Sequence, residues 1–415
     1  MFERLVLLIL FLLPWQTRYI FDDGVTSIYT VELLILVTFF FGLRLHIRKE
    51  HQIPARWLGF VLLASLVSVV FAINRELSFF LWLHLLFAAL FFLLLLDQRV
   101  QPLRVLHTFC LGLLIPIGIG IYQVLTGDAF SSSWFGLAEH DVNMLGTSVI
   151  EGTASRWLRA YGTFDHPNVF GGYVATALFC ILALLSRQSR RPRHYKIIFL
   201  SLLSIFSFAL VISFSRSAWL AFFLALLVSG SLLLWKNRVR AVAGLPFLSL
   251  TLLLLAIFVG VFADPVFSRF SPELRLEARS LAERTSEYQQ FPDVFLQQPF
   301  TGIGVGGYPL ALEQLNPGKP EWSYQPIHNS LLLILVEVGF VVALVLFAWA
   351  WSIDKINYTA IRRGSVRAIT AIGFGTILLV VAMLDHYLWS SWSGLALLAF
   401  SMAMTLRLSD DHTHS

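Results

Sequence analysis

Long, nearly uninterrupted apolar blocks constrain this chain more than any other feature of its sequence. Most are close to the length of about 17–25 residues that lets a helix cross the hydrocarbon of a bilayer. We therefore predict an all-α polytopic membrane protein in which residues 1–415 form a single membrane domain. The blocks predict about twelve transmembrane helices, at approximately 5–20, 29–43, 57–73, 77–96, 103–125, 166–186, 196–213, 217–235, 241–262, 327–352, 366–384 and 388–406.

The composition excludes several other classes. Of the 415 residues, 57% are hydrophobic and 13% charged, whereas soluble domains are about half apolar and about a quarter charged. An ordinary cytosolic enzyme and a disordered chain are excluded.

Cys110 and Cys180 both lie inside apolar blocks, so we predict small buried hydrophobes rather than a disulfide or a zinc site. The stretch from Leu5 to Trp15 has no small-residue cleavage site and is expected to be a retained first helix.

The positions of the basic residues predict the sidedness of the helices. Lysine and arginine cluster after every second apolar block, as the positive-inside rule requires of a chain with both ends in the cytoplasm. The clusters hold 20 of the 30 basic residues: Arg4, Arg44, Arg48, Lys49, Arg56, Arg99, Arg104, Arg187, Arg190, Arg191, Arg193, Lys196, Lys236, Arg238, Arg240, Lys355, Arg362, Arg363, Arg367 and Arg407.

This parity places two long segments outside, at 126–165 and 263–327. The second contains an amphipathic helix, in which Ser271 could be the N-cap, Pro272 fits the first turn, and Arg279 and Glu283 form an i,i+4 pair.

Ionisable residues inside or at the rims of the blocks are candidate site residues, because such groups are costly in a membrane, and Arg284 on the helix of the second long segment is added to them. All fall on the predicted outer side, which points to one polar cavity open to the outside. They are Arg159, His166, Arg216, Arg284, His328 with its neighbour Asn329, Glu337, Asp385 and His386.

Arginines combined with histidine suit one reaction class. A guanidinium donates to phosphate oxygens in a planar fork, and imidazole accepts a proton near neutral pH. The set predicts displacement of a diphosphate leaving group by an alcohol. Most of these residues also have a plain structural explanation. Arg216 could be a snorkelling residue and Arg284 could lie on a solvated helix face. His328 could be a helix-start residue and Glu337 a hydrogen-bonded residue inside a span, while His166, Asp385 and His386 could be loop or turn residues.

Two other motifs carry less weight. Asp22 and Asp23 are an adjacent acidic pair in the first external loop, and we expect neither a metal site nor a cofactor. Gly302, Gly304 and Gly307 have the G-x-G-x-x-G spacing but lack a βαβ context, so we predict that they only let the backbone turn.

The segments YGTFDHPNVFGGY, FSRSAW, QQPFTGIGVGGY and HNSLLLILVEVG, in this order, resemble the O-antigen ligase and Wzy-type polymerase superfamily. The resemblance implies a GT-C type glycosyltransferase of the bacterial inner membrane, with its active site on the periplasmic face. Such enzymes transfer a glycan from undecaprenyl diphosphate to an acceptor hydroxyl, with inversion and without a metal.

Carried over residue by residue, the resemblance implies that Arg216 and Arg284 hold the diphosphate and that His328 is the essential histidine. Arg159, His166, Asn329, Asp385 and His386 would line the site.

We expect an O-antigen ligase acting on a lipid A–core acceptor, with membrane lipids and no nucleic acid as further partners. A Wzy-type polymerase, a protein O-oligosaccharyltransferase and a transporter of lipid-linked sugars remain open. The rim position of the polar residues favours an enzyme over a transporter, whose sites lie near the midplane.

Overall fold

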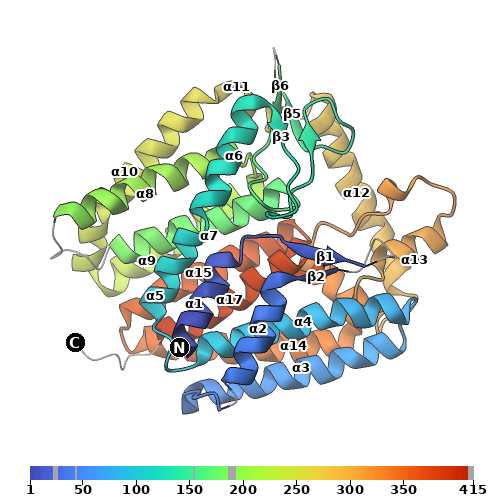
Figure 1. The fold of residues 1–415 in the computed structure, drawn as a ribbon, viewed down its shortest axis with the longest axis horizontal. Coiled ribbons are helices and arrows are strands. Elements are labelled where there is room, and N and C mark those ends of the chain that lie inside the picture. The colour runs from blue at the N-terminus through green and yellow to red at the C-terminus, as the bar shows by residue number, and fades with distance from the viewer. Residues whose placement is uncertain (22–26, 43, 153–154, 186–192, 410–415) are drawn as a thin grey trace.

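The computed structural model describes residues 1–21, 27–42, 44–152, 155–185 and 193–409 as a bundle of long helices. Most of the helices run along one common direction (Figure 1). The helices of the apolar blocks are α1 (Phe2–Leu12), α2 (Thr30–Phe41), α3 (Gln52–Val70), α4 (Arg75–Leu96), α5 (Pro102–Gly112), α6 (Leu114–Thr126), α7 (Pro167–Leu185), α8 (Arg193–Ile212), α9 (Arg216–Lys236), α10 (Arg238–Val261), α14 (Ser330–Arg362), α15 (Val366–Leu384), α16 (Tyr387–Ser390) and α17 (Trp392–Ser409).

The predicted all-α polytopic membrane fold is confirmed, and every predicted block contains a helix. Within the described residues, nine helical segments are long and apolar enough to cross a membrane. α1 and α2 have 11 and 12 residues, about 17 Å of helix against a hydrocarbon core of about 30 Å. The count of twelve spans therefore stays a prediction.

Two predicted spans are interrupted, each for a local reason. The block at 103–125 divides at Leu113 into α5 and α6. Pro116 has no N–H to donate to the carbonyl of Gly112, four residues earlier, so regular helix bonding fails there. The block at 388–406 divides into the short α16 and α17, with Ser391 in an extended conformation between them.

Several predicted basic clusters meet at one end of the bundle, which we call the basic end. Arg104 forms an ion pair with Glu3 at 2.7 Å. Arg99 pairs with Asp97 at 2.8 Å, and Arg407 donates to the Asp97 carbonyl at 2.7 Å. The ends of α4 and α17 thus lie beside the starts of α1 and α5. Arg187, Arg190 and Arg191 lie outside the described residues.

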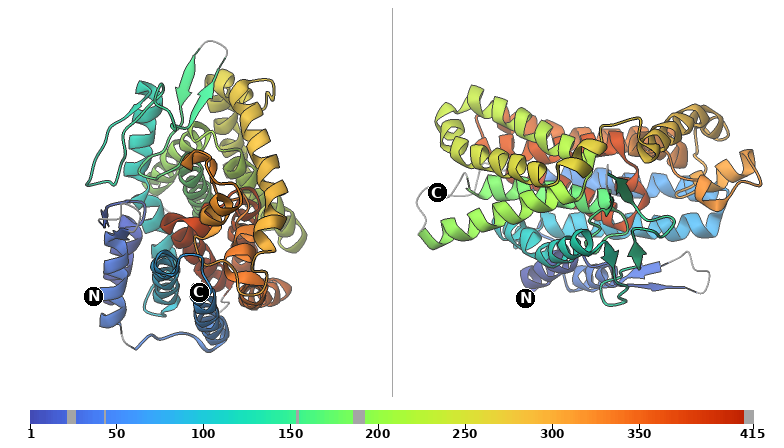
Figure 2. Two further views of the ribbon diagram at one scale, coloured as in Figure 1. Left: turned by 90° about the vertical axis from the view of Figure 1, so that its right-hand side faces the viewer. Right: turned by 90° about the horizontal axis from the view of Figure 1, so that it is seen from above.

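The opposite end, which we call the site end, is covered by hairpins and short helices (Figure 2). Three two-stranded antiparallel hairpins lie here, two of them within 126–165, where the sequence predicted only a long segment. These elements are β1 (Arg18–Ile20) with β2 (Ser27–Tyr29), β3 (Asp128–Ala129) with β4 (His140–Asp141), β5 (Val149–Glu151) with β6 (Arg156–Leu158), α11 (Ala263–Ser268), α12 (Arg275–Phe295), α13 (Tyr308–Leu315) and η2 (Glu321–Ser323).

α12 is the predicted amphipathic helix, with one error in its start. The Arg279–Glu283 ion pair is confirmed at 2.7 Å. The predicted cap at Ser271 is wrong, because the helix begins at Arg275 with Leu274 at the N-cap position. The Ser271 hydroxyl instead donates to the Phe267 carbonyl at 3.3 Å. This hydrogen bond closes the turn after α11.

The bundle core positions the turn between α15 and α16. α7 and α17 are largely buried, and Phe109 of α5 stacks on Phe400 of α17 at 4.1 Å. A Cβ at Gly172 of α7 would lie 1.9 Å from the Tyr387 hydroxyl. Only glycine admits this approach, which sets α16 against α7. Cys110 and Cys180 are free and buried, as predicted.

The glycine-rich loop before α13 holds a kink in α14. Gly302 and Gly304 have φ of 76° and 97°, and Gly339 inside α14 has φ of 76°. At this kink the Gly304 N–H donates to the Glu337 carbonyl at 2.9 Å, and the Phe340 N–H donates to the Pro299 carbonyl at 2.8 Å. The prediction that the loop glycines turn the backbone is confirmed for Gly302 and Gly304, whereas Gly307 has an ordinary φ of −78° at the N-cap of α13. The carbonyls freed by the kink accept from N–H groups of the loop.

Candidate functional site

α12 crosses the site end and carries three charged residues toward the bundle. Glu277, Arg284 and Glu287 are spaced by seven and three residues, which places them on one side of a helix. Along the axis they lie about 10 Å and about 5 Å apart. Glu277 and Glu287 are buried and bind cations of other segments, so α12 connects the start of α9 to the start of α14.

Arg216 lies at the first position of α9, after a tight turn. Phe214 has φ of 48°, and the Ser215 side chain caps the helix by accepting from the Ala218 N–H. The Arg216 side chain, 28% exposed, forms an ion pair with Glu277 at 2.9 Å. It also donates to the Arg269 carbonyl at 2.8 Å. The turn therefore presents the guanidinium toward α12 rather than toward lipid.

Arg269 is a site residue that the sequence analysis missed. Its side chain forms a second ion pair with Glu277 and donates to the Phe214 carbonyl at 3.3 Å. Burial lowers the pKa of the Arg269 guanidinium, Glu277 opposes this, and the charges of Arg216 and Arg284 lower it further. Arg216 and Arg284 are thus each close enough to Arg269 to repel it, and the three arginines form a cationic centre suited to an anion.

His328 is held by Glu287 through two groups. The backbone N–H of His328 donates to Glu287 Oε2 at 2.9 Å. The ring Nδ1 lies 2.9 Å and 3.0 Å from the two carboxylate oxygens. Burial alone lowers the pKa of His328, but the hydrogen bond and the charge of Glu287 outweigh it and leave the pKa raised. No residue in the described part of the chain forms a hydrogen bond with Nε2.

Asn329 fixes the start of the helix that follows His328. Its Oδ1 accepts from the N–H groups of Leu331 and Leu332, both at 3.1 Å. Its Nδ2 donates to the Tyr288 hydroxyl at 3.2 Å. The side chain is occupied as an N-cap, and it also ties α14 to α12.

Arg284 is close enough to both Arg269 and His328 to act on their charges. Its charge lowers the pKa of both Arg269 and His328, and that of His386 as well. Among the residues that the structure describes, no carboxylate forms an ion pair with it. A partly buried cation that has no carboxylate partner among the described residues and lies near both Arg269 and His328 favours an anionic ligand over a purely solvated face.

Asp385, in the turn after α15, lies near the imidazoles of three histidines. Burial raises the pKa of the Asp385 carboxyl, but His386, His166 and His328 together with the Asn168 hydrogen bond leave it lowered. The rings of His328 and His386 meet edge to face, with centroids 5.0 Å apart. The Asp385 carbonyl accepts from the N–H and hydroxyl of Ser330, which fixes this turn beside His328.

Arg159 reaches the same turn through Asn168. The buried guanidinium donates to Asn168 Oδ1 at 2.7 Å, to Ser148 Oγ at 3.0 Å and to the Ser213 carbonyl at 3.1 Å. Asn168 Nδ2 in turn donates to Asp385 Oδ2 at 2.6 Å. Burial lowers the pKa of Arg159 to about 9, so it stays charged at neutral pH. These contacts fit a residue that positions Asp385.

The candidate residues of the sequence therefore meet at the site end. Exposed His166 accepts from the Asn168 N–H at 3.1 Å and stands at the edge of the cluster. Glu337 lies deeper and accepts from the Trp389 indole at 2.8 Å. The sequence analysis did not identify a carboxylate among these arginines, but Glu277 forms ion pairs with both Arg216 and Arg269. Asp22 and Asp23 lie outside the described residues.

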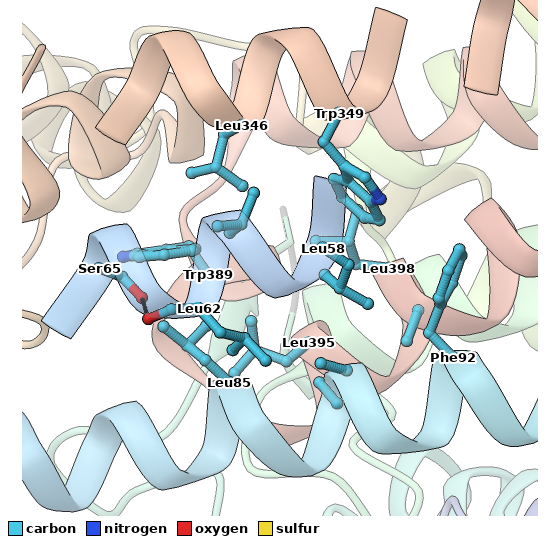
Figure 3. Close-up of a pocket in the computed structure, with 14 residues that line it drawn as sticks. Leu58, Leu62, Ser65, Leu85, Phe92, Leu346, Trp349, Trp389, Leu395 and Leu398 are labelled. Carbon is cyan, nitrogen blue, oxygen red and sulfur yellow. Dashed lines mark hydrogen bonds between the residues drawn. The ribbon is translucent and has the colours of Figure 1, made fainter. Parts of the chain in front are cut away.

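An apolar pocket lies between helices beneath this cluster (Figure 3). Trp389 connects the two, because its indole lines the pocket while its backbone N–H donates to the His386 carbonyl at 3.0 Å. The other labelled lining residues are Leu58, Leu62 and Ser65 of α3, Leu85 and Phe92 of α4, Leu346 and Trp349 of α14, and Leu395 and Leu398 of α17.

Comparison with protein families confirms the resemblance seen in the sequence. Residues 201–347 match the family described as O-antigen ligase. The matched region contains Arg216, Arg284 and His328 together with the α12 carboxylates, and it leaves out Arg159 and Asp385. The search of curated proteins finds no significant match.

Proposed function

We propose that this chain is an O-antigen ligase, which transfers a glycan from undecaprenyl diphosphate to a hydroxyl of lipid A–core oligosaccharide in lipopolysaccharide biosynthesis. The transfer would take place on the periplasmic face of the bacterial inner membrane, with both chain ends in the cytoplasm. The observation that carries this proposal is the pairing of His328 with Glu287 next to a cationic centre of three arginines.

His328 is the proposed general base. Glu287 holds Nδ1, so Nε2 is the nitrogen that can take the proton from the acceptor hydroxyl. The acceptor oxygen then attacks the anomeric carbon as the bond from that carbon to the phosphate oxygen breaks. Attack from the face opposite the leaving group inverts the anomeric configuration. Glu287 stabilises the imidazolium that forms.

Arg216 and Arg284 are the proposed diphosphate ligands. Negative charge builds up on the leaving diphosphate as the glycosyl bond breaks, and guanidinium groups stabilise it without a metal. Arg269 adds positive charge behind them. The cations are provided by the chain itself, so the reaction needs no cofactor.

Two alternative functions remain to be compared with the ligase. A Wzy-type polymerase or a protein O-oligosaccharyltransferase would use the same donor site and differ only in the acceptor. A transporter of lipid-linked sugars is disfavoured because the ionisable cluster lies at one end of the bundle rather than at its middle.

A reconstituted reaction separates these possibilities. Purified protein in detergent is incubated with glycan-loaded undecaprenyl diphosphate and either lipid A–core, a second loaded donor or an acceptor protein. Product on lipid A–core supports the ligase, and product on a second donor supports the polymerase. Since detergent leaves no membrane to cross, product on any acceptor cannot come from transport alone. The absence of product with all three acceptors contradicts the enzyme proposal.

Glu287→Gln tests the orientation of His328. The substitution removes the charge that raises the His328 pKa, so the pKa falls and the imidazole is neutral at lower pH. We expect the acidic limb of the kcat/KM profile to move to lower pH. We expect the plateau rate to drop by about 10²-fold, because the ring loses its orienting partner.

Glu283→Gln is the matched control for this profile. Glu283 lies on the same helix, is exposed and pairs only with Arg279 among the described residues. Its pH profile should equal that of the unmodified protein. An unchanged acidic limb in Glu287→Gln would contradict the assignment of His328 as the titrating base.

A further inference from the structure

A groove lies between α3 and α14 at the basic end, far along the bundle from the candidate site. One wall is formed by η1 (Lys49–His51) and the start of α3, and the other by the last turns of α14. Its lining residues are Glu50, Ile53, Trp57, Ala348, Trp351, Ser352, Lys355, Ile356, Thr359, Ala360, Arg363 and Ser409.

The groove changes in character along its length. Lys355 and Arg363 are exposed and lie toward the end of α14. Trp57 of α3 and Trp351 of α14 line the groove from its two walls, and indoles commonly lie at the level of lipid headgroups. Ala348 lies about two turns further along α14 from its end than Lys355, whereas Ile53, at the start of α3 beside Glu50, is exposed at the end of the groove. Along α14 the cations Arg363 and Lys355, the Trp351 indole and the aliphatic Ala348 follow in this order, which matches the polarity of a phospholipid from headgroup to chain.

We propose that this groove binds an anionic glycerophospholipid of the leaflet at the basic end. The phosphate would lie against Lys355 and Arg363, and one acyl chain would follow α14 past Ala348. Basic pockets between transmembrane helices are suited to anionic headgroups. The proposal does not depend on the proposed function, because no residue of the groove belongs to the candidate site.

The length of the groove fits one leaflet. From Lys355 to Leu346 is nine residues of helix, about 14 Å, and half of a hydrocarbon core is about 15 Å. Leu346 and Trp349 line the apolar pocket in the same seam between α3 and α14. The side chains around Leu58 and Trp349 leave this pocket without polar groups apart from Ser65 and the indoles (Figure 3). A chain placed along α14 therefore ends at an apolar surface.

The charge of the groove selects the headgroup. Glu50 is the one carboxylate among the lining residues, against Lys355 and Arg363. The lining thus carries a net charge of one positive unit, which favours a lipid with net negative charge. A zwitterionic lipid of the same chain length would gain no net electrostatic attraction.

Native mass spectrometry of the detergent-purified protein tests this proposal. Phosphatidylglycerol and phosphatidylcholine with identical chains are titrated separately. We expect preferential binding of phosphatidylglycerol, and loss of about 25-fold in its affinity in Lys355→Gln/Arg363→Gln, about fivefold for each cation removed. Phosphatidylcholine binding should stay weak and unchanged.

Arg362→Gln is the matched control, because Arg362 is exposed and adjacent in the chain but does not line the groove. It should keep the phosphatidylglycerol affinity. Equal losses in this control and in the double variant would mean general charge attraction and would overturn the proposal, as would equal affinity for the two lipids.

Ala348→Trp tests the acyl-chain part while leaving both cations in place. It should weaken phosphatidylglycerol with long chains severalfold and leave dihexanoyl phosphatidylglycerol unaffected. Equal effects on both lipids, or none on either, would contradict the placement of the chain. Unchanged melting temperatures without added lipid verify that the variants are folded.

Discussion

His328→Ala should reduce glycan transfer by at least about 10³-fold. A general base contributes about 10²–10⁴-fold, and the substitution also leaves the buried Glu287 without its partner at Nδ1. The donor should still bind, because Arg216, Arg269 and Arg284 are unchanged. The expected pattern is a collapse of kcat with a nearly unchanged Kd for undecaprenyl diphosphate, measured by binding and by product formation.

Two further variants control this experiment. His46→Ala replaces a histidine at the basic end whose side chain is 61% exposed, and it should transfer at the normal rate. His328→Gln keeps a polar group that can still meet Glu287 but cannot act as a base, and it should be as inactive as His328→Ala. Normal turnover in His328→Gln would show that His328 is not the general base. Its role would then be to position other groups of the site.

Much of the fold follows from the sequence because apolar length is a local property. Each predicted block contains a helix, since about 20 apolar residues have few alternatives to a helix in lipid. The breaks at Leu113 and Ser391 depend on single residues within blocks and were not predicted. The hairpins within 126–165 are short pairings that alternation over two or three residues does not reveal.

The candidate site was predictable for most of its cations, but not for Arg269 or for the carboxylates of α12. Arg216 and His328 stand at the rims of apolar blocks, so their position alone marks them, whereas Arg284 lies on the predicted amphipathic helix. Glu277 and Glu287 sit in a helix rich in charge, and only the packing of α12 across the bundle shows which charges face inward. The sequence feature that could have identified them is the spacing of Glu277, Arg284 and Glu287, which places all three on one face of the helix.

Arg216→Lys should lower kcat/KM for the donor by about 10²-fold, although the charge is kept. The guanidinium contacts both Glu277 and the Arg269 carbonyl through one nitrogen, and we propose that its remaining N–H groups donate to the diphosphate. A charged hydrogen bond is worth about 1.5–3 kcal/mol, so losing one or two of them gives this factor. Lysine offers one ammonium where arginine offers a planar fork. Arg279→Gln, which breaks the exposed pair with Glu283, should leave donor use unchanged.

A structural role for Arg216 gives a different result in a double variant. If Arg216 only neutralises Glu277, then Arg216→Gln/Glu277→Gln removes both charges together and should restore the activity lost in Arg216→Gln. If Arg216 holds the diphosphate, the double variant stays impaired, since Arg269 alone cannot replace the lost contact. We expect the second result, with the KM for the donor raised in both variants. Recovery of the double variant to near-normal rates would assign Arg216 to stability, and diphosphate binding would then rest on Arg284 and Arg269.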